Sequence, residues 1–450
     1  MKNYAWILVI AACALCGLPD KSAAAEDTPK SKALPPIPLS LNEVHAWIDR
    51  SHPLLKGAGT EKTSARGKML KALGAFEPVL VNDTEIERFV DKGTTKTQSV
   101  GFNDTLVEAR TPWGFRGSAG VRQAIGDAKI PDLSFGNGNQ QVILGGFLPL
   151  LKGLMINPEH AELQRSELAD PRAEVKISQT RQDLFLAAAT QFWDWVSAAK
   201  FVDVQRRALG VAEERLRQVE GRAKAGAVAP LDVVEAGQEV QRRREVAIAA
   251  QRAVEQEQYK MSMFLWENQT PTTPQLERVP DFPPPAALPT ADIVKADKLQ
   301  AKSDRPEIRE VDIEAKVNNI DLELAKNNLL PSLDLEAAPA RAPEKFVLGL
   351  GYRFGAELRI PILQRRSRGE VMEAQAQADR LVLVQKYREQ QVVVDVDNAL
   401  SAIERAKERV AAAAESLRMA KTLEEGERFR FSLGATSVLF VNLRERNSVD

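Results

Sequence analysis

The chain of 450 residues carries 61 Lys and Arg against 62 Asp and Glu, a formal charge of −1. This balance argues against nucleic acid as a partner, because phosphate binding needs a clustered basic excess. The chain has only three His and two Cys, and both Cys lie within the first sixteen residues. A disulfide-stapled or zinc-ribbon fold is therefore excluded, and no cofactor is expected.

Residues 1–25 have the pattern of an export signal. A basic start at Lys2 is followed by an apolar run and by three alanines ending at Ala25, so we predict cleavage after Ala25. As an alternative, residues 10–13 have the form of a lipoprotein box, which would acylate Cys13. Both readings take the chain out of the cytoplasm. No later segment is apolar enough to cross a bilayer as a helix of about 20 residues.

The rest of the chain is predicted to contain one structural unit twice, at 39–266 and 291–450, around a Pro-rich connector at 267–290. Matching landmarks recur in the same order, and the first two stand 25 residues apart in both units. Four paired landmarks indicate an internal duplication. They are Pro53 and Pro306, Pro78 and Pro331, Pro149 and Pro361, and Gly226 and Gly434.

Each unit is predicted to hold two long helices. The first is expected to be interrupted at Asp170-Pro171, a cap followed by a first-turn proline. The stretch 366–431 has no proline, which predicts a helix about 100 Å long. A seven-residue apolar period indicates coiled-coil packing in both units. Its members include Trp195, Val202, Ala212 and Val219, then Ile403, Val410 and Leu417.

Two short strands are expected in each unit, at 106–121, 141–151, 332–338 and 350–363. In the last, Arg353, Glu357 and Arg359 alternate with apolar residues, which is typical of a strand with one wet and one apolar face. Four strands can span a membrane only if several chains close a barrel together. An aromatic belt at the membrane surface is predicted from Trp113, Phe115, Phe147, Tyr352 and Phe354.

The pattern resembles the outer membrane factor family, the TolC-like efflux and secretion channels. The resemblance rests on the paired proline landmarks, on Leu148-Pro149-Leu150-Leu151 after a strand, and on the segment 226–236. It implies a mainly α fold with a small transmembrane β part. It also implies a homotrimer with a twelve-stranded barrel in outer membrane lipid above a twelve-helix periplasmic tunnel. A periplasmic adaptor (membrane fusion) protein and an inner-membrane pump would be the partners.

The same resemblance implies that Gly226 and Ala227, and Gly434 and Ala435, form periplasmic helix–turn–helix tips where the tunnel narrows. Asp232 falls where some members place an acidic constriction residue. A helix N-terminal carboxylate, stabilised by the macrodipole, explains Asp232 equally well. In the second unit, Phe440 stands at the position of Asp232 and Leu443 at that of Glu235. These apolar residues fit a hydrophobic constriction at the second tip as well as the family fits a charged ring there.

The repeat offset would carry the last helix to about residue 474, so we expect either a shortened last helix or a fragment. No catalytic or nucleotide-binding motif is present, which indicates a passive duct driven by a partner and not an enzyme. His45, His52 and His160 are expected to be packing or surface residues. The alternative function is a periplasmic coiled-coil adaptor or scaffold without a pore.

Overall fold

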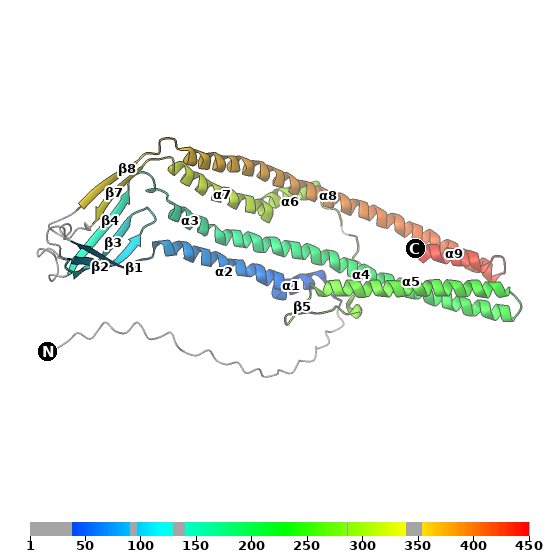
Figure 1. Cartoon of the computed structure of the whole chain (residues 1–450). Helices are drawn as coiled ribbons and strands as arrows, with labels where there is room; N and C mark the ends of the chain where they lie inside the picture. The colour runs from blue at the N-terminus through cyan, green and yellow to red at the C-terminus, as the bar shows by residue number, and fades with distance from the viewer. Residues whose placement is uncertain (1–37, 91–96, 129–139, 286, 339–352, 450) are drawn as a thin grey trace, which may run out of the picture.

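The computed structural model describes residues 38–90, 97–128, 140–285, 287–338 and 353–449. A sheet lies at one end of an elongated molecule, and long helices run from it to the opposite end (Figure 1). The predictions for the export signal, for Cys13 and for Tyr352 lie outside the described residues.

Several of the helices begin where the sequence supplies caps and first-turn prolines. Ser40 caps α1, Asn157 caps α3, and prolines occupy the first turns of α2, α3, α5 and α7. An interruption near Asp170 is confirmed, but the break falls at Leu168, which is the N-cap of α4, and Asp170 lies in the first turn instead of capping it. The helices are α1 (Leu41–Ser51), α2 (Pro53–Leu73), α3 (Pro158–Glu167), α4 (Ala169–Lys224), α5 (Pro230–Ser262), α6 (Ala291–Asp304), α7 (Pro306–Asn327), α8 (Arg365–Ser432) and α9 (Val438–Val449). None of those described contains an apolar stretch long enough to cross a bilayer.

The sheet has six antiparallel strands among the described residues, in the order β1-β2-β3-β4-β7-β8. The prediction of two strands per unit is wrong for the first unit, which contributes four. The stretch 106–121 spans the turn between β2 and β3, closed by a hydrogen bond from the Thr111 N–H to the Phe115 carbonyl. The strands are β1 (Val79–Val90), β2 (Thr97–Arg110), β3 (Arg116–Gly126), β4 (Gln140–Pro149), β7 (Ser332–Ala338) and β8 (Arg353–Arg359).

The main core lies where α1 meets the middle of α4. Phe192 and Trp195 are almost fully buried there against Val44 and Ile48, so these aromatic side chains of α4 serve in packing. The Trp47 indole N–H donates to the Trp266 carbonyl at 2.8 Å. The connector returns to this core through a short hairpin, β5 (Trp266–Glu267) and β6 (Thr270–Pro271), and an ion pair of 2.8 Å between Arg278 and Glu43.

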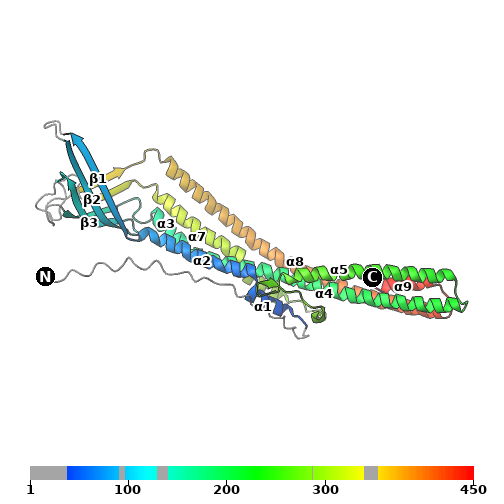
Figure 2. The same ribbon diagram turned by 60° about the horizontal axis from the view of Figure 1, so that its bottom comes forward.

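The two predicted coiled-coil stripes differ in how far they are buried within the protomer. Val202, Ala212 and Val219 on α4 are buried in the α4–α5 hairpin, as expected. The stripe on α8 is exposed, with Ile403 at 51% and Val410 at 58% of their full exposure. In Figure 2, α8 stands apart from α2 and α4 beside the sheet and approaches the other helices around the middle of the molecule. A helix with an apolar stripe needs a partner along that stripe, so α8 is not fully packed by the described part of this chain.

His52 joins the α1–α2 corner to the end of α5. Its Nδ1 accepts from the Leu54 N–H at 3.3 Å, and its Nε2 lies 3.1 Å from the Met263 carbonyl oxygen. A carbonyl can only accept, so Nε2 carries the hydrogen and the ring is neutral. Burial lowers the pKa of His52 below its usual value of 6.5, and the hydrogen bond to Met263 opposes part of that effect.

Thermal stability is expected to fall as the pH drops below about 6.5. The unfolded chain then binds a proton at His52 that the folded chain binds only at lower pH, so acid favours unfolding between the two pKa values. Melting curves at pH 7.5 and 5.0 would measure this loss. His52→Asn keeps a side-chain acceptor for the helix cap and removes the titration. An unchanged pH dependence in this variant would assign the effect to other groups.

Candidate functional site

The sheet has one apolar face that is exposed in the protomer. Side chains alternate along a strand, and the strand register therefore assigns each residue to a face. All but one of the exposed large apolar side chains in the sheet share a face, and the exception is Val79. Arg88 is the only charged residue with a described side chain on this face. The apolar face carries Leu80, Ile86, Val90, Val107, Val121, Val142, Leu144, Leu335, Phe354 and Leu358.

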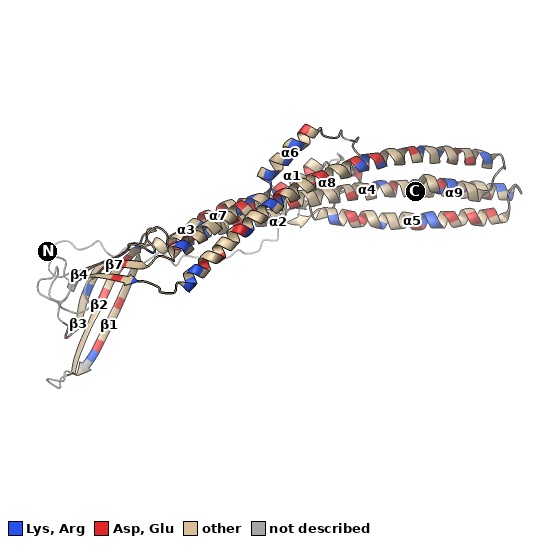
Figure 3. Ribbon diagram, turned by 90° about the horizontal axis from the view of Figure 1, so that it is seen from above, with Lys and Arg blue, Asp and Glu red and all other residues tan. Residues whose placement is uncertain are grey.

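The opposite face of the sheet is charged, and charged residues are visible along the strands in Figure 3. Arg122 is only 5% exposed there. It makes two hydrogen bonds to the Asp104 carboxylate, at 2.7 and 2.6 Å, and its guanidinium lies 5.1 Å from the Phe102 ring centre. The face carries Asp83, Glu85, Glu87, Asp104, Glu108, Asp334, Glu336 and Glu357 with Arg110, Arg116, Arg122 and Arg359. One face therefore suits lipid and the other suits water.

The predicted aromatic belt divides between these faces. Trp113 and Phe115 stack with ring centres 5.4 Å apart in the β2–β3 turn. Phe354 is 74% exposed on the apolar face. Phe147 lies on the charged face instead, 3.9 Å from the Arg116 guanidinium. A belt on the apolar face would therefore consist of Trp113, Phe115 and Phe354 among the described residues, and its contact with a membrane stays a prediction.

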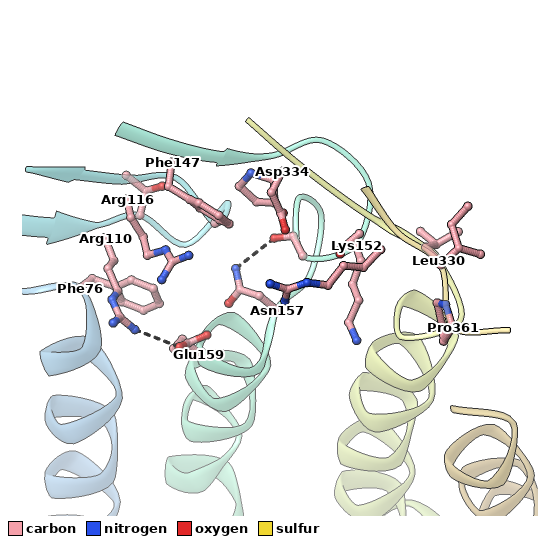
Figure 4. A pocket seen from close by; sticks show the side chains of 17 residues that line it. Phe76, Arg110, Arg116, Phe147, Lys152, Asn157, Glu159, Leu330, Asp334 and Pro361 are labelled. Carbon is pink, nitrogen blue, oxygen red and sulfur yellow. Dashed lines mark hydrogen bonds and ion pairs between the residues drawn. The ribbon is translucent and has the colours of Figure 1, made fainter. Parts of the chain in front are cut away.

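A cavity of about 570 Å³ lies where the sheet joins the helices (Figure 4). Two of its lining residues, Arg110 and Glu159 of α3, form an ion pair with an N–O distance of 3.3 Å. Asn157 donates to the Pro112 carbonyl at 2.8 Å and thereby fixes the β2–β3 turn on α3. The lining contains four basic residues, Arg110, Arg116, Lys152 and Arg359, and two acidic ones, Glu159 and Asp334. The charged face of the sheet therefore continues into the helical part.

The two predicted tips lie together at the end of the molecule opposite the sheet (Figures 1 and 2). Gly226 and Gly434 both adopt a positive φ, +69° and +74°, which ends a helix at low cost only for glycine. Arg222 on α4 donates to the carbonyls of Phe431 and Ser432 at the end of α8, at 3.1 and 3.2 Å. The two turns are thus tied to each other, and Ala227 and Ala435 are exposed beside them.

Asp232 acts at the start of α5. Its Oδ2 accepts from the Ala229 N–H at 3.1 Å, so its carboxylate lies at the helix N-terminus, as the macrodipole explanation requires. Glu235 is half-buried one turn later, while Phe440 on α9 is 53% exposed. A constriction role for these three residues stays a prediction.

A buried network of charges, which the sequence did not predict, joins the four tip helices. Glu445 on α9 pairs with Arg215 on α4 and with Arg428 on α8, the latter at 2.9 Å. Glu239 on α5 binds Arg243 at 2.9 Å and Arg446 of α9 at 3.1 Å. Burial lowers the pKa of Arg215, and the attraction of Glu445 opposes this shift. Buried charges are tolerated only when paired, so this network holds α9 in place.

Gly226→Ala is expected to destabilise the first tip by about 1–2 kcal/mol, because an alanine at positive φ is strained. Nothing lies within 4 Å of the added Cβ, so the cost comes from the backbone and not from a clash. Hydrogen exchange across the end of α4 would report it as faster local opening. Gly226→Asn is the matched control, because asparagine tolerates this conformation. Equal exchange in both variants would contradict the prediction.

No group of three or more His, Cys, Asp or Glu that could hold a metal ion is found in the described ranges. No family model matches the sequence, and a search of curated proteins gives no match.

Solved structures, in contrast, are similar over most of their length. The Campylobacter jejuni CmeC outer membrane channel is 13% identical, with a TM-score of 0.64 over 91% of this chain and 80% of that one. VceC, an outer membrane protein of Vibrio cholerae, is 13% identical, with a TM-score of 0.64 over 91% and 90%. The open state of the Neisseria gonorrhoeae MtrE outer membrane channel is 16% identical, with a TM-score of 0.61 over 91% and 83%.

The chain therefore has a TolC-like fold, built from long helices and a small sheet. This is the fold of the outer membrane factors that its sequence resembles. Formed from the strands that the structure describes, the sheet is not closed within the protomer.

Proposed function

We propose that the chain is the subunit of a trimeric outer membrane channel that extends into the periplasm. The observation that carries this proposal is the sheet, whose exposed side chains are mostly apolar on one face and mostly charged on the other. In water the apolar face would be a large exposed patch, which soluble monomers rarely keep. In a closed membrane barrel, lipid would cover the apolar face, and the charged face would line water.

The channel would serve as the exit duct of a tripartite efflux or type I secretion system. The α8 helix, about 100 Å long from its 68 residues, would form part of a tunnel wall, and its exposed stripe supports packing in a larger assembly. Transport would be passive and would involve no catalysis. An inner-membrane pump would supply the energy, and a periplasmic adaptor would connect the pump to the duct near the two tips.

Purification in detergent followed by planar-bilayer recording tests the proposal. A trimer by mass that conducts ions is the expected result. A water-soluble monomer without conductance would refute the channel. It would support the alternative, a periplasmic adaptor or scaffold, which shares the long helices but does not need a sheet with one apolar face.

A further inference from the structure

The two edges of the sheet are β1 and β8. Within the described residues β1 pairs only with β2, and β8 pairs only with β7. Each edge therefore presents one row of backbone N–H and C=O groups without a strand partner. Such an edge invites pairing in water, and in lipid it is too costly to remain open.

We propose that β1 of one copy pairs antiparallel with β8 of the next, so that every copy contributes six strands to the wall. This inference rests on the proposed function. In the trimer the wall would then contain 18 strands, in place of the 12 that the family resemblance implies. The strand that pairs with each edge therefore belongs to a second copy of this chain.

Strand direction supports the pairing. β1 follows α2 and runs away from the helices, while β8 runs back toward α8. Because six is an even number and all neighbours are antiparallel, β8 of one copy and β1 of the next point in opposite directions. An even strand count is also the rule in bacterial membrane barrels.

The stagger of the strands is that of a closing barrel. One row of paired residues runs from Phe354 through Ala337, Gly146, Gly117 and Ala109. Extended from Ala109 to β1 in the same register, this row falls just before Val79. β8 continues from Phe354 to Arg359, five residues beyond that row. The sheet thus shifts by about one residue per strand, as in an eight-stranded barrel with a shear of 8.

The stagger also fixes the register between copies. A shift by one residue would exchange the two faces, so residues of even number on β1 must lie beside residues of even number on β8. Val79 then falls opposite about Arg359, Leu80 beside Leu358, and Val81 beside Glu357. Leu80 and Leu358 are 71% and 57% exposed in the protomer, and they would pack against each other on the apolar face.

The first hairpin, formed by β1 and β2, has the properties of strands in a membrane barrel. Leu80 and Ile86 extend the apolar face, and Glu85 extends the charged one. The polar side chains on its apolar face are mostly neutral and bond to one another. Asn82 donates to Thr105 at 2.8 Å and exchanges hydrogen bonds with Asn103 at 3.2 and 3.1 Å. Internal pairing of this kind is what lipid requires of polar groups.

Disulfide trapping in the detergent-purified trimer tests the pairing. The double variant Val81→Cys with Glu357→Cys is expected to give covalent dimers and trimers on mild oxidation. Val81→Cys with Leu358→Cys is the matched control, because these two residues would lie on opposite faces. Single-cysteine variants control for Cys13 and Cys16, the native cysteines.

A twelve-stranded wall predicts a different cross-link. The first hairpin would then stand outside the wall, and β3 would meet β8 of the neighbour. Cross-linking of Ser118→Cys to Glu357→Cys between copies, without any at Val81, would overturn the six-strand wall and leave the trimeric channel intact. A purified protein that is not a trimer would instead refute the proposed function.

Discussion

Val107→Arg is expected to reduce stable insertion of the channel, whereas Glu108→Arg, at the next residue of β2, is expected to insert and conduct. Val107 is 47% exposed on the apolar face, and Glu108 lies on the charged face. An arginine on the lipid side of a barrel costs about 2–4 kcal/mol at the bilayer midplane and about 0–1 kcal/mol near the interfaces, and Val107 lies three residues from the end of β2. Every subunit of a trimer would bear that cost. On the water side the same residue joins other charges.

Membrane fractionation and planar-bilayer conductance, carried out on both variants, would measure the difference. Because the two positions are adjacent, strand propensity and local backbone effects are closely matched. Full insertion of both variants, or equal loss of both, would show that the apolar face does not meet lipid. A soluble adaptor would tolerate both changes, since Val107 and Glu108 are already exposed.

The helices could be predicted from sequence because their signals are local. First-turn prolines at Pro53, Pro158 and Pro306 mark three starts. The alternation of apolar and charged residues in 353–359 identified β8 and its two faces.

The first hairpin escaped prediction because its alternation is weak. Asn82 and Thr84 stand on the otherwise apolar face of β1, where cross-strand hydrogen bonds make polar groups acceptable. A spacing could have revealed the extra strands. Pro78 and Pro149 are 71 residues apart, but the matching Pro331 and Pro361 are only 30 apart, and the excess is long enough for two more strands.

The tip network could not be read from the sequence for a different reason. Arg215 and Glu445 are 230 residues apart, and in a charged helix each looks like an ordinary surface residue. Only the packing of four helices shows that both are buried. The glycines of the two turns were predictable because a positive φ selects the residue type directly.

Glu445→Gln is expected to release α9 from the tip and, because the family resemblance implies that the tunnel narrows there, to raise conductance. The change leaves the buried Arg215 without its carboxylate partner, and breaking a buried pair in this way costs about 3–5 kcal/mol. Hydrogen exchange should show α9 and the facing part of α4 opening more often. Glu214→Gln is the control. Its partner Arg217 lies three residues away on an exposed surface, where an ion pair contributes about 0–1 kcal/mol.

A compensated variant separates lost charge from lost packing at the tip. Arg215→Met together with Glu445→Leu removes both charges and keeps most of the volume, which is often neutral or stabilising for a buried pair. Arg428 would retain Glu424, 2.6 Å away. If the network holds the tip closed through pairing, the double variant should restore slow exchange and low conductance. An open tip in the double variant would show that the geometry of these hydrogen bonds, and not burial of matched groups, keeps α9 in place.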